Sequence, residues 1–278
     1  MIALSTGSLY NYGIARVFAL AAETGYDGVE VLIDGRWDSR DPIYLRRLSL
    51  DCGLPIVALH SPFVAEVQGW PTDQLGRLDH TVALASELAV PVVVAHSPMR
   101  YYGMMSQVNF WGYSRVVLPI PWLRRDPYFY YLRDGRLQQL ESSSGIIVAV
   151  ENMPAHRFLG LTLNAYWFNR PKEFTRFHHM TLDTTHLGTW GIEPINVYEQ
   201  FKQRVVHVHL SNFDGREHRC PSNGKLHLGK LLRHLCQDGY AGAVSVEGAP
   251  DALEAEDERK CQKALKRALT FCREHLTR

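Results

Sequence analysis

Eight short runs of mainly apolar, β-branched residues recur along the chain, and they constrain its fold more than any other feature. Segments with helical periodicity separate many of them, for example at 14–26, 73–90, 195–204 and 228–240. Eight strands that alternate with helices over roughly 250 residues predict a (β/α)8 TIM barrel. We expect residues 1–278 to form a single domain of this kind. The expected strands lie at 2–5, 28–33, 56–60, 91–96, 145–151, 180–183, 205–210 and 242–247.

A doubly wound open sheet is the competing architecture. It is disfavoured because no expected strand is followed by a GxGxxG or Walker phosphate loop. In addition, polar residues follow the strands all along the chain, whereas an open sheet would gather them at one crevice.

Residues 99–130 form a long aromatic-rich insertion after the fourth strand. An irregular segment of this length is usually functional, so we interpret it as a lid or as an interface with another subunit, which would make the chain a homo-oligomer. Arginines at 100, 115, 124 and 125 also allow a nucleic-acid stacking surface. The chain carries 30 basic and 29 acidic residues, however, and this balance offers no wider basic footprint.

Cysteine usage and hydropathy indicate where the chain works. Its five cysteines are an odd number without CxxC spacing, which favours a reduced, cytoplasmic setting. The first residues lack the charged and apolar regions of an export signal, and no run of about 18 apolar residues occurs. We therefore expect no membrane partner.

A carboxylate or an imidazole occurs in or near the end of seven of the eight expected strands. Side chains alternate along a strand, so counting back from Glu151, His209 and Glu247 places these residues on the inward face, at the rim where barrel enzymes carry their chemistry. Burying several carboxylates together costs several kcal/mol per ion unless protons or a cation compensate. The residues are Glu30, His60, His96, Glu151, Asp183, His209 and Glu247.

A divalent metal ion is the simplest compensation. Mixed carboxylate and imidazole ligands suit Mn, Mg, Co, Zn or Fe. Asp183 could instead only cap the helix that follows it, and Asp is a good N-cap residue. His60 and His96, each in an "HSP" turn, could orient a substrate or a carboxylate. We expect Glu30 to accept a hydrogen bond at the rim, and His207 to support the site from the interior.

The motifs taken in order resemble those of a known superfamily. "GYDGVEVL", "LHSP", "AHSP", "VAVENMP", "LDTTH", "HVHLSNFDGREH" and "DGYAGAVSVEGAP" span the second to the eighth strand. Together they resemble the xylose isomerase-like TIM barrels, which include sugar phosphate isomerases and epimerases and the apurinic endonucleases related to endonuclease IV.

The epimerase and dehydratase branches imply one divalent metal held by Glu151, Asp183, His209 and Glu247. The metal would hold the carbonyl and its neighbouring hydroxyl, and Glu151 and Glu247 would carry protons on opposite faces of the substrate. The free-ketose epimerases usually have a further Glu six residues after the first ligand. This chain has Arg157 there, which would suit an anionic substrate.

The endonuclease branch implies three zinc ions and further histidines, matched here by His60, His96, His186 and His218. That branch has an Asp two residues before the last His, where this chain has Arg216. The departure argues against three zinc ions and leaves a two-metal site open. His186 is then either a ligand or a group that contacts a ligand or the substrate.

Three functions follow in order of preference. The first is a divalent-metal-dependent isomerase or epimerase, or a related lyase, that transfers protons next to the carbonyl of a small polyhydroxylated substrate. The second is a zinc-dependent phosphodiesterase of the apurinic-endonuclease type. The third is a non-catalytic barrel that serves as a binding or accessory subunit, which the intact pair Glu151 and Glu247 argues against.

Overall fold

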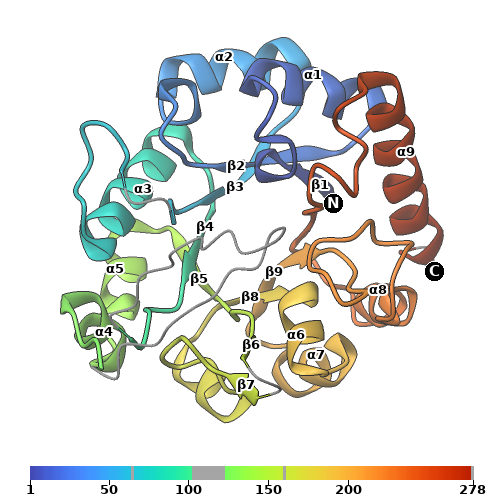
Figure 1. The fold of residues 1–278 in the computed structure, drawn as a ribbon. Coiled ribbons are helices and arrows are strands. Elements are labelled where there is room, and N and C mark those ends of the chain that lie inside the picture. Colours follow the sequence, from blue (N-terminus) through green and yellow to red (C-terminus); the bar gives the residue numbers. More distant parts are fainter. Residues whose placement is uncertain (64–65, 102–122, 159–160, 277–278) are drawn as a thin grey trace.

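Eight parallel strands close into a barrel, and helices surround it (Figure 1). The structure is a computed structural model that describes residues 1–63, 66–101, 123–158 and 161–276. The strand order around the barrel is β1-β10-β9-β8-β5-β4-β3-β2. The prediction of a TIM barrel is therefore confirmed. The barrel strands are β1 Ile2–Ser5, β2 Gly28–Leu32, β3 Ile56–His60, β4 Val92–His96, β5 Ile147–Glu151, β8 Met180–Asp183, β9 Val205–Leu210 and β10 Ala243–Val246.

The helices follow the strands along the chain and cover the outside of the barrel (Figure 1). They are α1 Ile14–Thr24, α2 Pro42–Cys52, α3 Gln74–Leu88, α4 Pro127–Arg133, α5 Leu137–Ser144, α6 Thr184–Trp190, α7 Pro194–Phe201, α8 Leu228–Gln237 and α9 Glu258–His275, with short 3₁₀ turns η1 Thr6–Leu9, η2 Trp37–Ser39 and η3 Pro171–Arg176.

Local signals in the sequence explain where several helices begin and end. Asp41 and Asp73 cap α2 and α3, because their side chains accept hydrogen bonds from backbone amides in the first turn. Gly25 and Gly53 end α1 and α2 in the left-handed conformation, with φ of 96° and 64°. Each of these stops lies only a few residues before the next strand, which keeps the connections short.

The two faces of the strands pack differently, as the alternation in the sequence predicts. The outward face joins the helices in one large apolar core. The inward face holds a small cluster of mostly small apolar residues that includes Ala3, Ala58, Val94 and Ala149. This cluster fills the lower part of the barrel, and the polar residues lie above it toward the strand ends.

Two features differ from the sequence expectations or extend them. The amphipathic pattern of residues 252–276 predicts a last helix, but α9 begins only after Asp257, whose side chain accepts hydrogen bonds from two amides of the first turn. Residues 252–256 are turns. A small antiparallel hairpin, β6 His156–Phe158 and β7 Leu161–Leu163, stands outside the barrel and was not expected.

The aromatic-rich insertion falls largely on residues 102–122, outside the described residues, so its interpretation as a lid or an interface stays a prediction. Its described ends pack on one tryptophan. The guanidinium groups of Arg100 and Arg125 lie 4.7 and 5.7 Å from the ring centroid of Trp167. The Trp167 indole N–H donates to the Arg124 carbonyl. Among the described residues, no helix combines the length and the apolar character that a membrane span requires.

Candidate metal centre

The strand register brings the polar strand ends together at one end of the barrel. His96 pairs with Glu151 across β4 and β5, and Asp183 pairs with His209 across β8 and β9. His60 ends β3, and Glu247 directly follows β10. The residues expected to converge from different strands therefore do converge.

Four of these residues form the cluster expected to hold a metal. One potential ligand atom each from Glu151, Asp183, His209 and Glu247 lies within 4.8 Å of all the others. His209 Nδ1 is central: it lies 2.9 Å from Glu151 Oε1, 3.1 Å from Glu247 Oε2 and 3.7 Å from Asp183 Oδ2. Glu151, Asp183 and His209 are fully buried, whereas 16% of the Glu247 side chain is exposed. Glu247 is therefore the most exposed of the four residues.

Asp183 uses its two oxygens differently. Oδ1 accepts a hydrogen bond of 2.7 Å from the backbone amide of His186, so Asp183 does cap α6. Oδ2 is buried and accepts no hydrogen bond from the residues that the structure describes. Its nearest imidazole atoms, Nδ1 of His186 and Nδ1 of His209, lie 3.6 and 3.7 Å away. A buried carboxylate oxygen without a donor is the atom that a cation would satisfy.

Two further histidines surround the second oxygen of Glu151. His96 Nε2 lies 3.0 Å from Glu151 Oε2, and His60 Nε2 lies 3.5 Å from the same atom. The two rings meet edge to face with centroids 4.8 Å apart. His60 is fully buried, and 19% of the His96 side chain is exposed. Both imidazoles thus face the Glu151 carboxylate, and the role of orienting it stays a prediction.

His186 and His218 lie beside this cluster and not within its group of four. His186 Nδ1 is 2.9 Å from the Asn152 carbonyl, and a neutral ring that donates there keeps Nε2 as an acceptor. Potential ligand atoms of His186, Glu217 and His218 form a second group within 4.8 Å. Sequence reasoning missed Glu217, although it stands beside Arg216 in the motif where a carboxylate was sought.

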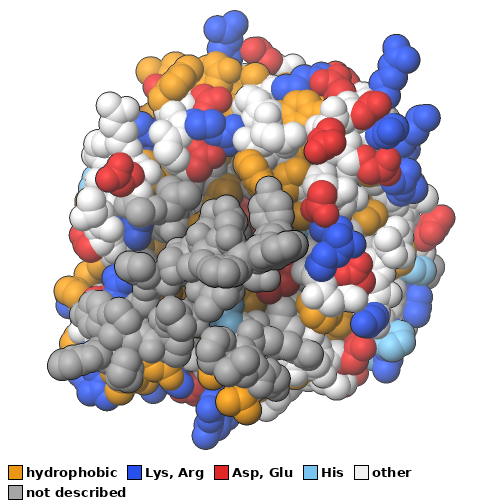
Figure 2. Space-filling model, in the orientation of Figure 1, with side chains coloured by type: hydrophobic (Ala, Val, Ile, Leu, Met, Phe, Trp, Pro, Cys, Tyr) orange, Lys and Arg blue, Asp and Glu red, His pale blue; other side chains and the backbone are white. Residues whose placement is uncertain are grey.

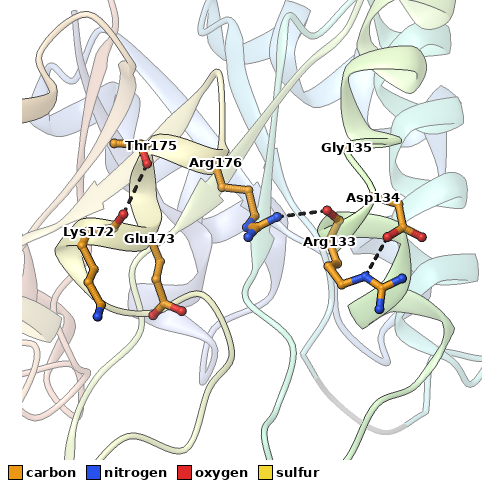
Figure 3. A pocket seen from close by; sticks show the side chains of 7 residues that line it. All are labelled: Arg133, Asp134, Gly135, Lys172, Glu173, Thr175 and Arg176. Atoms are coloured by element: carbon orange, nitrogen blue, oxygen red, sulfur yellow. Dashed lines mark hydrogen bonds and ion pairs between the residues drawn. The ribbon is translucent and has the colours of Figure 1, made fainter.

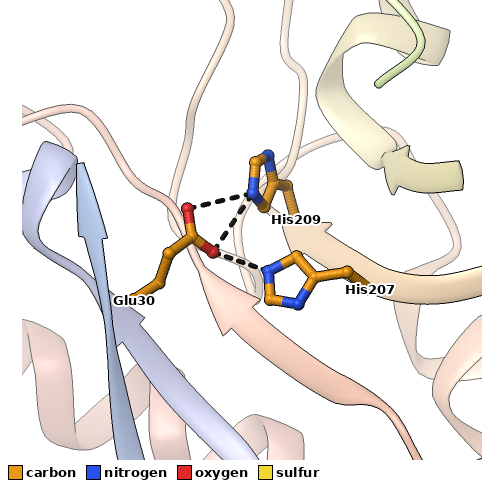
Figure 4. Close-up of side chains that lie close together, drawn as sticks. All are labelled: Glu30, His207 and His209. Atoms are coloured by element: carbon orange, nitrogen blue, oxygen red, sulfur yellow. Dashed lines mark hydrogen bonds and ion pairs between the residues drawn. The ribbon is translucent and has the colours of Figure 1, made fainter. Parts of the chain in front are cut away.

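Glu30 does not lie at the rim, where we expected it. It is fully buried inside the barrel, in register with Ser5 and Ala58 and two residues before the end of β2. Its carboxylate contacts Nε2 of His207 at 2.6 Å and Nε2 of His209 at 3.1 Å (Figure 4). The expectation of a hydrogen-bond acceptor is confirmed, but its partners are in the interior.

Asn152 and two threonines of the "LDTTH" motif also hold the site, and sequence reasoning did not single them out. The Asn152 side chain donates to the carbonyl of Asp183 and accepts from its amide, both at 2.9 Å. Thr184 Oγ1 donates to the carbonyl of Ser211 at 2.6 Å and accepts from its amide. Thr185 Oγ1 donates to the Asn212 carbonyl. These bonds tie the end of β8 to its neighbours on either side.

The charges in the cluster shift one another's ionisation. Burial alone would raise the pKa of Glu151, but the charge of His209 and hydrogen bonds from three imidazoles hold it well below its usual range. Burial would lower the pKa of His209, but Glu247, Glu30 and Glu151 raise it well above its usual range. The pKa of Glu247 is likewise lowered by His209 despite its burial. The carboxylates thus favour positive charge at the position of His209.

The donor set fits a divalent cation. It offers three carboxylates and one imidazole as ligands. Among the described residues, no group donates a hydrogen bond to Asp183 Oδ2. Hard or borderline cations such as Mg, Mn, Co, Zn and Fe prefer such oxygen and nitrogen ligands. Of the described residues, Glu151, Asp183, His209 and Glu247 would hold the ion.

Arg216 and Arg157 mark the two departures from the family motifs, and the structure describes the side chain of Arg216. The Arg216 side chain is 69% exposed and pairs with Asp214 at 3.3 Å. Arg157 lies in β6, and its side chain falls outside the described residues. Around the barrel mouth, basic and acidic side chains are interspersed over the described surface that Figure 2 shows.

A separate cavity of about 650 Å³ opens between α4 and η3. Arg133, Asp134, Lys172, Glu173 and Arg176 are among the residues that line it (Figure 3). None of the expected site residues lines this cavity, and Arg133 and Asp134 pair with each other at 2.7 Å. It is therefore distinct from the cluster at the barrel mouth.

Comparison with known proteins places the chain among related barrels. A protein of Mycobacterium tuberculosis described as uncharacterized is 28% identical over 300 aligned residues, which cover 100% of this chain and 98% of that protein. An uncharacterized protein of Mycobacterium leprae is 26% identical with the same coverage.

Two solved structures share the fold. The 3-keto-D-glucoside 4-epimerase of Escherichia coli superposes with a TM-score of 0.66 at 18% identity, covering 98% of each chain. A family 2 AP endonuclease of Brucella melitensis gives 0.65 at 19% identity, covering 95% of each chain. Residues 18–268 match the sequence profile of one family. On that match, the chain belongs to the xylose isomerase-like TIM barrel family.

Proposed function

We propose that the chain is a divalent-metal-dependent isomerase or epimerase, or a related lyase, that moves protons next to the carbonyl of a small sugar-like substrate. The observation that carries the proposal is the convergence of Glu151, Asp183, His209 and Glu247 within 4.8 Å, with Asp183 Oδ2 buried and without a donor. Family membership and the fold shared with a sugar epimerase support it.

The chemistry divides between the cation and the side chains. A bound divalent ion would hold the carbonyl and neighbouring hydroxyl oxygens of the substrate and stabilise the negative charge that develops as a C–H proton leaves. Glu151 and Glu247 would accept and return that proton from different sides, because they extend from β5 and β10, which are separated by β8 and β9.

The surroundings of the two glutamates suggest how each exchanges its proton. Glu247 is partly exposed and can exchange with water directly. Glu151 is buried, but its Oε2 contacts His96, whose side chain is partly exposed. His96 would therefore relay protons between Glu151 and solvent, with His60 holding the carboxylate in place from the buried side.

Solvent exchange tests the proposal directly. The chain, loaded with Mn²⁺, Mg²⁺, Co²⁺, Zn²⁺ or Fe²⁺, is incubated with ketoses and keto-sugars in ²H₂O, and NMR follows deuterium entry next to the carbonyl. We expect exchange that Glu151→Gln lowers by about 10²- to 10⁴-fold without loss of the fold, because a positioned proton carrier contributes about that much. Glu199→Gln, on an exposed face of α7, is the matched control. Undiminished exchange in Glu151→Gln would refute the assignment.

A second candidate is a phosphodiesterase that uses two or more metal ions. It is favoured by the second group of ligand atoms from His186, Glu217 and His218, and by the two histidines at Glu151 Oε2. Metal analysis and an abasic-DNA cleavage assay separate the candidates. Two or three zinc ions per chain with strand cleavage would replace the isomerase proposal, whereas one ion per chain without cleavage supports it.

A further inference from the structure

Glu30 reaches across the barrel interior to contact a strand that is not its neighbour. It extends from β2, and its partners His207 and His209 lie on β9, with β1 and β10 in between. The residues in register on those intervening strands are small: Ser5 pairs with Glu30, and Ser245 pairs with His209. Small side chains at these positions leave the space that the carboxylate crosses.

The contacts assign the protons on both rings. An ionised carboxylate only accepts hydrogen bonds, so Nε2 of His207 and Nε2 of His209 must both donate to Glu30. The bond from His207 is 2.6 Å, which is short and charge-assisted. When a cation takes the place of the proton on Nδ1, the His209 ring keeps its proton on Nε2 and presents the lone pair of Nδ1 toward the cluster of Glu151, Asp183 and Glu247.

Glu30, His207 and His209 also lie close enough to be considered as a metal site of their own. The 2.6 Å separation argues against this, because two ligands that share one ion at about 2 Å each lie roughly 3 Å apart or more. All three residues are fully buried. In addition, His209 Nε2 would have to coordinate this ion while it also contacts the Glu30 carboxylate. The geometry is that of a hydrogen-bonded support.

We infer that Glu30, held in place by His207, is a positioning residue for the metal ligand His209: it fixes the ring and its Nε2–H tautomer so that Nδ1 points into the cluster. The inference rests on the proposed metal centre and assigns a role to residues outside its four ligands. Carboxylates that accept from a ligand histidine make the ring a better ligand, and losing them typically lowers metal affinity about 10- to 100-fold.

Co²⁺ binding to the full chain tests the inference without an activity assay. After treatment with a chelator, Co²⁺ is titrated and its visible absorption recorded. We expect Glu30→Gln to weaken Co²⁺ binding about 10- to 100-fold and to change the Co²⁺ spectrum, because His209 loses its fixed orientation. His207→Leu should weaken binding about tenfold, and His207→Gln, whose amide still donates to Glu30, should restore most of it.

Ser5→Ala is the matched control. It removes a buried hydroxyl beside Glu30 that has no hydrogen-bond partner in the described parts of the chain, so Co²⁺ affinity and spectrum should stay at the wild-type values. Circular dichroism of each variant without metal verifies the fold. Wild-type affinity and an unchanged spectrum in Glu30→Gln would overturn the positioning role alone, whereas no Co²⁺ uptake by the wild-type chain would overturn the proposed metal centre with it.

A measurement on the wild-type chain gives an independent answer if the variants do not fold. Nitrogen-15 NMR of the histidine-labelled, Zn²⁺-bound chain distinguishes the two imidazole tautomers. We expect the proton of His209 on Nε2. A proton on Nδ1 of His209 in the Zn²⁺-bound chain would overturn the inference.

Discussion

Asp183 shows that a structural and a functional interpretation of one residue need not compete. From the sequence, a helix cap and a metal ligand were alternatives. In the structure, Asp183 Oδ1 accepts a hydrogen bond from the amide of His186, and Oδ2 is buried among the carboxylates and imidazoles of the cluster. Because a carboxylate has two acceptor oxygens, capping fixes the orientation in which the second oxygen faces the cluster.

Two substitutions of Asp183 should separate these contributions. Asp183→Asn keeps an oxygen that caps α6 and removes one negative charge, so the metal-free chain should unfold at about the wild-type denaturant midpoint while metal binding falls to trace levels. Asp183→Ala should lose the metal and in addition about 1 kcal/mol of stability. Urea unfolding and metal analysis measure both effects. Full metal occupancy in Asp183→Asn would contradict the ligand role.

Also at the scale of residues, the sequence predicted which residues converge but not which partners each side chain contacts. Strand phase alone placed Glu151, His209 and Glu247 on the inward face. It did not distinguish the end of a strand from its interior, so Glu30 was expected at the rim. Glu217 was missed because its approach to His186 depends on the loop after β9, and the spacing of a loop in sequence does not fix its path.

At the scale of elements, the start of α6 is joined to the end of β9 by one hydroxyl. Thr184 Oγ1 donates to the carbonyls of His209 and Ser211 and accepts from the amide of Ser211, all within 3.1 Å. These groups are buried, so no water replaces the hydroxyl if it is removed. This bond network sets the position of the strand that carries His209.

Thr184→Val should therefore lower the free energy of unfolding by more than its small change in side-chain volume would suggest. The substitution keeps the shape and leaves buried backbone groups without a partner, which we expect to cost about 1 to 3 kcal/mol. Chemical unfolding measures the loss. Thr175→Val in η3, whose hydroxyl bonds only to the nearby Lys172 carbonyl at an exposed position, is the control and should change stability by less than about 0.5 kcal/mol. Equal effects in both variants would contradict the role of the hydroxyl.

Helix α9 buries its thiols against the barrel. Burial, and then the charge of Glu258, raises the pKa of Cys261 to about 11, and burial raises that of Cys272 to about 12. Below these values both groups are neutral thiols, which are poor nucleophiles. At pH 8 we expect a thiol reagent to modify the partly exposed Cys52 and Cys236 and to spare Cys261 and Cys272.

Counting reactive thiols with and without denaturant measures this difference. Cys236→Ser should remove one reactive thiol from the folded chain, and the matched Cys261→Ser should remove none. Rapid reaction of all five thiols in the folded chain would contradict the packing of α9.

The strands were predicted within one or two residues because each is a short apolar run bounded by turn residues. The last helix was predicted six residues too early, since the stretch before it is equally rich in charged and apolar residues. Only the cap formed by Asp257 sets its start. The helix is nevertheless essential to the barrel, because residues such as Leu265 and Leu269 are fully buried.

At the scale of the whole molecule, the candidate site depends on closure of the barrel. β1 pairs with β10, so the two ends of the chain complete the ring of strands, and α9 packs beside α1 (Figure 1). The candidate ligands come from β5, β8, β9 and the end of β10, which span most of the second half of the chain. The cluster therefore requires these neighbouring strands to be paired, as they are in the closed barrel.

This dependence predicts that metal stabilises the fold as a whole. An ion that binds only the folded chain adds about 2.7 kcal/mol at a concentration of 100 times Kd. For a chain of 278 residues this raises the melting temperature by roughly 5 °C. Thermal unfolding followed by circular dichroism, with chelator and then with each divalent metal, measures the shift.

The variants used above make that measurement specific to the cluster. Ser5→Ala, which leaves the cluster intact, should show the full metal-dependent shift. Asp183→Asn should melt at about the same temperature with and without metal, because the ion loses a ligand while the cap of α6 remains. An equal shift in Asp183→Asn would mean that the ion binds elsewhere on the chain, and the absence of a shift in the wild-type chain with every metal would argue against a resident cation at the barrel mouth.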